Sequence, residues 1–408
     1  MTVAGSGSVT AASSGAEITG SAGPEPLVVY GPLSDRYDFG PQHPLTPRRF
    51  GPGIDLLRAA GATRFLGPQP ASDGQLQRLH DARYVETVKA FARDQGRRTS
   101  AGIGPGDCPP FPDMHTVSAA VAGGSIAAMD LIMSGEERHA FQPGGGLHHA
   151  MADRASGFCI YNDVALAISW LLAAGAQRVA YIDVDAHHGD GVQEIFYHDP
   201  RVLTVSIHEG PQTLFPGTGL PTEVGGEGAE GSSVNIALPP GTADAGWLRA
   251  FHAVVPQVVA AFKPDIIVSQ QGCDSHMDDP LTHLMLSVDG QRASYLAICD
   301  LADQVCGGRW VATGGGGYSV LDVVPRAWTH LLSIVAGRPL DPHTPTPEQW
   351  RARVQELRGR PAPLSMTDGR VTANKPWADG YDPASWLDRS ILAARTAVFP
   401  LHGLDPMP

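Results

Sequence analysis

The sequence predicts an α/β protein, a single open-faced domain with a central, mainly parallel β-sheet flanked by helices. The first observation is a set of short, almost wholly apolar runs typical of buried parallel strands, at 178–184, 202–207, 266–270 and 310–313. The second is the helix-length sequence between these runs. The third is the presence of polar residues directly after the runs. In parallel sheets, ligands bind beyond the carboxyl ends of the strands, where such residues would lie. An active site is therefore expected at that edge.

Two further segments have the pattern of helices. Residues 116–133 are rich in Ala and Met and end before a glycine, while 162–174 start at a capping Asn162 or Asp163. From about residue 339 the sequence becomes Pro-rich and polar, with one helical stretch at 347–357. We expect a disordered leader over 1–26, a catalytic domain over 27–338, and a C-terminal extension over 339–408 packed on the same domain.

Composition excludes some classes of function. The chain has 408 residues and a formal net charge of -13, with 42% hydrophobic and 17% charged residues. This acidic balance argues against nucleic acid as a partner, because binding to phosphates relies on Lys and Arg. Oligomeric state is not readable from these numbers.

Cysteine usage and the N-terminal residues suggest a compartment. The five cysteines are odd in number and form no Cys-x-x-Cys pair, which favours free thiols in a reducing environment. Residues 1–26 have neither the basic start nor the apolar core of a signal peptide. No apolar run is expected to reach membrane-spanning length, so we expect a cytoplasmic protein without a membrane partner.

The most informative stretch, residues 181–191, reads YIDVDAHHGDG and follows one of the apolar runs. Alternate residues of an extended strand point to the same side, so Asp183, Asp185 and His187 are expected to project together. Carboxylate oxygen and imidazole nitrogen suit a borderline metal such as zinc. A surface turn is the alternative, but carboxylates at the end of a buried strand are costly to desolvate without compensation. Asp274, just past another strand, is the candidate third ligand; its alternative role is a helix cap or turn.

Two more motifs supply groups for catalysis. Tandem imidazoles, His148 and His149, follow a glycine-rich loop and can carry protons, with Asp183 and Asp190 available to orient them. Four glycines precede Tyr318, but no Lys-Ser or Lys-Thr pair follows and the spacing does not match a dinucleotide site. A phenol there can donate a hydrogen bond to a developing oxyanion. These groups together predict metal-assisted hydrolysis of an amide.

With these motifs the chain resembles the zinc-dependent histone deacetylase family, which has the arginase/deacetylase fold, from about residue 27 to residue 337. The residues that carry the resemblance are His43-Pro44, Pro47-Arg48-Arg49, 144–150, Gly157-Phe158-Cys159, 183–192, 215–219, Gly272-Cys273-Asp274 and 314–318. Within the family, the segments 272–284 and 323–328 look like the bacterial acetoin-utilisation branch.

The resemblance implies a role for each matching position. It implies zinc at Asp185, His187 and Asp274, with His149–Asp190 as the principal base pair, His148–Asp183 as its partner, and Tyr318 polarising the acetyl carbonyl. Substrate would be bound by Asp107 at the rim and by Gly157, Phe158, Phe215 and Leu281, and Arg49 would lie toward an acetate exit. A structural potassium is implied at Asp183, at the Ser206 hydroxyl and at the carbonyls of Asp185, His187 and Ile207, whereas Ser232 makes a second potassium site less secure.

The resemblance implies a protein lysine deacetylase, with acetyl-CoA synthetase as a candidate acetylated substrate. A binuclear ureohydrolase is disfavoured, because Gly189 and His276 stand where its further carboxylates would be. An acetylpolyamine amidohydrolase remains an alternative, with Asp113 as a candidate gate for a second cationic nitrogen. A non-catalytic acyl-lysine binding protein is the alternative of another class. The choice between zinc and ferrous iron, the acyl-chain preference and the physiological target stay open.

Overall fold

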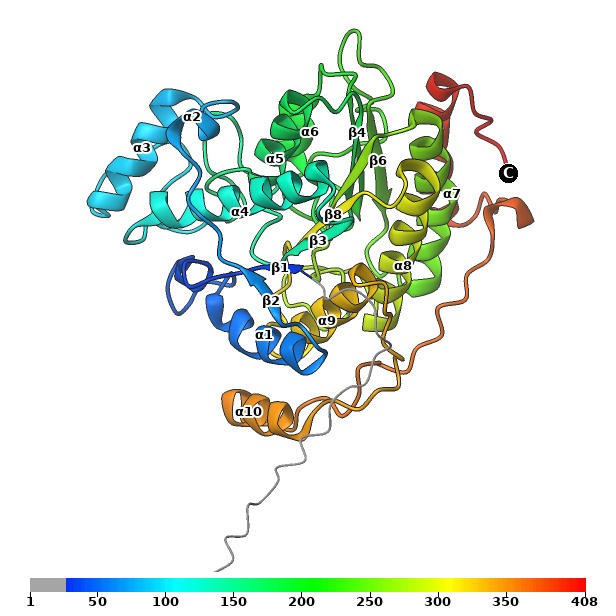
Figure 1. The fold of residues 1–408 in the computed structure, drawn as a ribbon. Helices are drawn as coiled ribbons and strands as arrows, with labels where there is room; N and C mark the ends of the chain where they lie inside the picture. Colours follow the sequence, from blue (N-terminus) through cyan, green and yellow to red (C-terminus); the bar gives the residue numbers. More distant parts are fainter. Residues whose placement is uncertain (1–26) are drawn as a thin grey trace, which may run out of the picture.

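The computed structural model describes residues 27–408, and the leader predicted over residues 1–26 lies outside that range. Eight strands form one sheet in which all neighbours run parallel (Figure 1). Across the sheet the order is β2 (Arg64–Leu66), β1 (Leu27–Val29), β3 (His139–Gln142), β8 (Trp310–Thr313), β7 (Ile266–Gln270), β4 (Val179–Asp183), β5 (Val202–Glu209) and β6 (Ser233–Leu238). The predicted fold class is confirmed.

Helices cover both faces of this sheet (Figure 1). They are α1 (Phe50–Ala59), α2 (Asp73–Leu76), α3 (Ala82–Arg93), α4 (Met114–Ser134), α5 (Asp163–Ala173), α6 (Asp190–Phe196), α7 (Asp244–Phe262), α8 (Val288–Cys306), α9 (Val323–Val335), α10 (Glu348–Arg358) and α11 (Trp386–Val398). Short 3-10 helices occur at η1 (Ser34–Arg36), η2 (Pro47–Arg49), η3 (Trp377–Asp379) and η4 (Phe399–His402).

The sheet separates two apolar cores. Along β4, Val179 and Tyr181 pack with α4, α5 and α6, whereas Ala180 and Ile182 pack with α1, α7, α8 and α9. Alternate side chains of a strand point to opposite faces, so a strand buried on both faces is expected to be mostly apolar. This requirement explains why the central strands were predictable as continuous apolar runs.

The predicted runs at 266–270 and 310–313 coincide with β7 and β8, and the other two lie within two residues of β4 and β5. Four strands were not predicted. Two of them, β1 and β2, have three residues each, and the other two, β3 and β6, contain polar residues that interrupt the apolar pattern.

One expected geometry was wrong. We expected Asp183, Asp185 and His187 to project together from an extended strand, but β4 ends at Asp183. Beyond it, the Asp185 N–H donates to Asp183 Oδ1 at 3.2 Å and the His187 N–H donates to Asp185 Oδ1 at 2.9 Å. Carboxylates that bond the backbone two residues ahead turn the chain. Asp183 therefore contacts His148, whereas Asp185 and His187 face a cavity.

The expectation that no apolar run reaches membrane-spanning length was also wrong. By length and composition α4 could cross a membrane. However, 67% of its most apolar window is buried inside the molecule, and core helices of soluble proteins pass the same test. The helix is therefore weak evidence for a membrane span.

The C-terminal segment (residues 339–408) lies against the helices of the sheet. Its helix α10 packs on α1, and Trp350 Nε1 donates to the Pro52 carbonyl at 2.9 Å. Its helix α11 packs on α7 and β6, where Arg249 and Asp388 form a buried, two-pronged ion pair with nitrogen–oxygen distances of 2.9 Å.

Candidate active site

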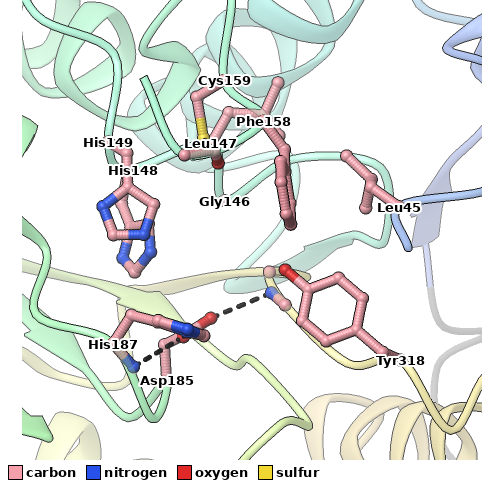
Figure 2. A pocket seen from close by; sticks show the side chains of 13 residues that line it. Leu45, Gly146, Leu147, His148, His149, Phe158, Cys159, Asp185, His187 and Tyr318 are labelled. Atoms are coloured by element: carbon pink, nitrogen blue, oxygen red, sulfur yellow. Dashed lines mark hydrogen bonds and ion pairs between the residues drawn. The ribbon is translucent and has the colours of Figure 1, made fainter. Parts of the chain in front are cut away.

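The candidate site lies where four loops leave the carboxyl ends of neighbouring strands. The loops after β3 and β4 carry His148, His149, Asp185 and His187, and those after β7 and β8 carry Asp274 and Tyr318. Because all these strands are parallel, their carboxyl ends share one edge of the sheet. Figure 2 shows His148 and His149 beside Asp185 and His187, with Phe158 and Tyr318 across the pocket.

Asp185, His187 and Asp274 form a buried cluster whose possible ligand atoms all lie within 4.8 Å of one another. His187 Nδ1 lies 3.0 Å from Asp185 Oδ1 and 3.1 Å from Asp274 Oδ2. A tetrahedral zinc ion with ligand bonds of roughly 2.0–2.2 Å separates its ligand atoms by about 3.3 Å. One imidazole nitrogen and two carboxylates at these spacings therefore fit a divalent cation and leave coordination positions open.

The electrostatics of the cluster also favour a cation. Burial lowers the pKa of His187, but hydrogen bonds to Asp185 and Asp274 outweigh it and raise that pKa well above its usual value. Burial and the charge of Asp185 raise the pKa of Asp274. Without a cation the cluster must hold protons to offset its buried negative charge, and a divalent cation supplies the same compensation.

Neighbouring groups hold the two carboxylates in place. Asp185 Oδ2 accepts from Gln270 Nε2 at 2.7 Å and from the Gly316 N–H at 2.9 Å, while Asp274 Oδ1 accepts from the Ala186 N–H at 2.8 Å. A Cβ on Gly316 would collide with Asp274 Oδ2, so only glycine fits this close approach. Such outer contacts fix the orientation of metal ligands.

The two histidines form separate pairs with carboxylates. His148 Nδ1 lies 2.7 Å from Asp183 Oδ2, and His149 Nδ1 lies 2.6 Å from Asp190 Oδ1. Burial lowers the pKa of His148, but the charges of Asp183 and Asp185 outweigh it and raise that pKa to about 9. Burial and the charge of His148 lower the pKa of His149. The pKa values of the two neighbouring histidines thus shift in opposite directions. His149 stays neutral and can accept a proton.

Tyr318 faces the cluster from the glycine-rich loop after β8. Its hydroxyl is turned toward the middle of the pocket (Figure 2). Burial and the charges of Asp274 and Asp185 raise the pKa of this hydroxyl well above its usual value, so it stays protonated as a hydrogen-bond donor. Its backbone N–H donates to Asp279 Oδ2 at 2.8 Å.

These groups surround a narrow pocket, whose empty space of about 290 Å³ includes solvent at its mouth. Its lining is Leu45, Gly146, Leu147, His148, His149, Gly157, Phe158, Cys159, Asp185, His187, Gly315, Gly316 and Tyr318. Much of this wall is apolar, as a neutral aliphatic amide would require. Asp185 and His187 of the cluster, the two histidines and Tyr318 therefore meet at one chamber, whereas Asp274 is buried beneath its lining.

The predicted substrate residues are placed around this cavity in different ways. Gly157 and Phe158 line it, and the ring of Phe215, 46% exposed, lies 5.1 Å from the ring of His149. Asp107 is exposed and accepts from the Gly157 N–H at 2.8 Å. Leu281 is not part of the lining and sits on the adjoining loop, where its N–H donates to Asp279 Oδ1 at 3.0 Å.

A second small cavity lies beside the first and shares Leu45 and Leu147 with it. Arg49 lines this second cavity, is only 4% exposed, and donates from Nη1 to the Gly315 carbonyl at 2.7 Å. A buried cation beside the chamber can attract a small carboxylate.

The residues implied for potassium lie on β5, at the end of β4 and in the loop that follows β4. Asp183 pairs with Ser206 across β4 and β5, next to Ile207, and all three are buried. Ser206 Oγ lies 2.8 Å from His208 Nδ1.

Sequence reasoning did not single out Gln270 and Asp279, although both support the site. Gln270 carried a signal, because a polar residue ends an otherwise apolar strand at the edge where ligands bind. Asp279 carried no such signal in the sequence apart from lying five residues after Asp274.

Comparison with known proteins gives a consistent result. A histone deacetylase domain matches residues 43–335. The acetoin utilization protein AcuC of Bacillus subtilis (strain 168) is 40% identical over 350 residues, which are 84% of this chain and 89% of that protein. The proteins of the same name in Staphylococcus xylosus and Staphylococcus aureus (strain MSSA476) are 38% and 41% identical, over 82% and 76% of this chain and 88% and 82% of their own.

Proposed function

Since this chain belongs to the histone deacetylase family, in its acetoin-utilisation branch, we propose that the deacetylase acts on N6-acetyl-lysine in proteins and depends on zinc. The observation that carries this proposal is the buried Asp185, His187 and Asp274 cluster, which shares one chamber with His149 and Tyr318. Ferrous iron accepts the same ligand set, so it is the second candidate metal.

A divalent cation held by Asp185, His187 and Asp274 would supply Lewis-acid polarisation of the acetyl carbonyl and of the attacking water. His149 takes the proton from that water, and Asp190 orients its ring through Nδ1. Tyr318 donates from its hydroxyl to the carbonyl oxygen as that oxygen becomes negative. When the C–N bond breaks, protonated His149 returns the proton to the lysine nitrogen, and the products are acetate and lysine.

The remaining residues bind substrate and release product. Gly157, Phe158 and Phe215 enclose the neutral stem of acetyl-lysine, Asp107 holds the substrate backbone at the rim, and Leu281 adds an apolar contact. The buried cation of Arg49 draws acetate toward the second cavity. A potassium ion held by the Asp183 carboxylate, the Ser206 hydroxyl and the carbonyls of Asp185, His187 and Ile207 would have a structural role, because it would stiffen the loop that carries Asp185 and His187.

The proposed substrate and compartment rest on the names of the relatives and on the state of the cysteines. An acetylated enzyme such as acetyl-CoA synthetase is the candidate protein substrate, because the relatives are named for acetoin utilisation. All five cysteines are free thiols, which supports a reducing, cytoplasmic location. Neither nucleic acid nor a membrane is proposed as a partner.

The acetylpolyamine alternative finds less support. Asp113 was the candidate gate for a cationic nitrogen, but its Oδ2 is paired with Arg36 Nη2 at 2.5 Å. The arginine offsets part of the charge with which this carboxylate would attract a second cation.

The proposal is tested by measuring acetate release from an acetyl-lysine peptide and from N-acetylated polyamines in parallel, with zinc-loaded protein. Turnover of the peptide is expected. Turnover of polyamines alone would reassign the enzyme to the polyamine class. Tight binding of the peptide without turnover of either substrate would contradict the proposed enzyme activity and favour an acyl-lysine binding protein.

A further inference from the structure

Asp368 belongs to the C-terminal segment, beyond the residues that match the family domain, yet its carboxylate contacts the loop that follows β7. Its Oδ2 accepts from His276 Nε2 at 2.9 Å and from the Val288 N–H at 2.8 Å. Its Oδ1 accepts from Arg326 Nη1 at 2.7 Å. One carboxylate therefore joins the C-terminal segment to α8, to α9 and to the loop that follows β7.

His276 transmits this contact into the metal-ligand loop, defined here as residues 274–279. Its side chain is only 1% exposed, and while Nε2 faces Asp368, Nδ1 accepts from the Asp278 N–H at 3.0 Å. The ring is thus fixed at both nitrogens, between the C-terminal segment and the backbone of the loop.

The metal-ligand loop supports the candidate site at both of its ends. Asp274 at its start belongs to the metal cluster, and Asp279 at its end holds the backbone of Tyr318 and of Leu281. A displacement of this loop would therefore disturb a metal ligand and the carbonyl-polarising phenol together.

A second carboxylate fixes Asp368 itself. Asp289, in the first turn of α8, accepts from the Thr367 hydroxyl and from the N–H groups of Asp368 and Arg370, the last two at 3.1 Å and 3.0 Å. Burial raises the pKa of Asp368, but its bond to His276 and the charge of Arg326 outweigh it and lower that pKa strongly. The group is therefore a rigidly held anion.

We propose that Asp368 is a positioning residue for the active site: through His276 it holds the metal-ligand loop so that Asp274 faces the cation and Asp279 faces Tyr318. The His276 ring bonds Asp368 through Nε2 and the Asp278 N–H through Nδ1. Loss of either hydrogen bond would release the middle of the metal-ligand loop. This inference rests on the proposed function: its effect on metal retention depends on the proposed metal site alone, and its effect on kcat depends on the proposed substrate as well.

The test compares Asp368→Asn with Asp388→Asn. Both carboxylates accept from an arginine and fasten the C-terminal segment to the body, but Asp388 bonds Arg249 on α7, away from the loop. The dissociation constant for Zn²⁺ is measured by competition with a chromophoric chelator, together with Tm, kcat and KM. Loss of an outer contact of a metal ligand typically weakens metal binding about 10–100-fold.

We expect Asp368→Asn to raise the Zn²⁺ dissociation constant about tenfold and to lower kcat more than it changes KM. Asp388→Asn should lower Tm while leaving Zn²⁺ binding within about twofold of wild type. Equal Zn²⁺ affinities in the two variants would overturn the proposal, whatever their Tm values.

A second variant, His276→Phe, keeps a ring in place and leaves the contacts of Asp368 with Arg326 and Val288 intact. It should weaken Zn²⁺ binding as Asp368→Asn does, and the double variant should be no weaker than either single one, because both remove the same link. Additive effects would overturn the proposal. If wild type fails to hydrolyse acetyl-lysine peptide but the Zn²⁺ pattern holds, the proposed substrate is wrong and the positioning role stands.

Discussion

The side chains of His149 and Asp190 meet at 2.6 Å, Nδ1 to Oδ1, and both are almost fully buried. The neighbouring ring of His148 lies 4.0 Å away, centroid to centroid, and has its own carboxylate partner. Because burial and the charge of His148 lower the pKa of His149, this residue is neutral and suited to accept a proton. Its carboxylate partner offsets part of that lowering.

The replacement Asp190→Asn should lower kcat about 100-fold, within the range usual for general-base catalysis. It should also shift the acid limb of the kcat/KM profile. Asp190 raises the pKa of His149, so without its charge that pKa falls further and the limb moves to lower pH.

The pH profile of acetyl-lysine peptide hydrolysis checks this, with Asp153→Asn, a change in an exposed surface pair, as control. An acid limb that stays in place, or moves to higher pH, would show that His149 is not the group that titrates.

Gly316→Ala should abolish tight Zn²⁺ binding. The added Cβ would lie against Asp274 Oδ2 and 2.9 Å from Asp185 Oδ2, and both carboxylates are too well held to move aside. Since two ligands would be displaced, a loss of at least tenfold in affinity is expected. Gly67→Ala is the matched control, because a Cβ there meets open space. Equal metal content of the two purified variants after dialysis would refute the assignment of the cluster as the metal site.

The stability of the protein should fall as pH drops from about 6.5 to 4, in part because of His80. Burial lowers the pKa of His80 to about 4. Its Nε2 accepts a hydrogen bond from the Asn162 N–H at 3.1 Å, and protonation of Nε2 would break this bond. Between these pH values the unfolded chain binds a proton on His80 that the folded chain does not. The free energy of unfolding therefore decreases with falling pH, by about 1.4 kcal/mol per pH unit for this group.

His80→Gln should flatten that dependence by the same amount and leave the slope above pH 7 unchanged. Urea unfolding at pH 4.5, 5.5, 6.5 and 7.5 gives the comparison. Parallel curves for wild type and variant would mean that His80 takes up its proton equally in both states.

The sequence was most informative where one physical requirement acts on consecutive residues. The central strands β4, β5, β7 and β8 are buried on both faces, so their residues are mostly apolar and polar side chains gather toward their carboxyl ends. Three-residue strands such as β1 and β2 carry no such pattern, and their place in the sheet depends on partners far along the chain.

The same distinction applies to the site. His148, Asp185 and Tyr318 stand in local motifs, so a role for each could be predicted from neighbouring residues. Asp279 and Asp368 act on residues 39 and 92 positions away, and only the folded chain brings these groups together. The turn after Asp183 was misjudged because side-chain hydrogen bonds, rather than strand geometry, direct Asp185 and His187.

The most direct test of the central claim is acetate release from an acetyl-lysine peptide by three samples: metal-free wild type, the same protein restored with Zn²⁺, and Tyr318→Phe with equal zinc content. We predict that activity is absent in the first sample and present in the second. In the third, kcat should fall about 100–1,000-fold, because the phenylalanine cannot donate to the developing oxyanion. Full activity without metal, or undiminished kcat in Tyr318→Phe, would contradict the account.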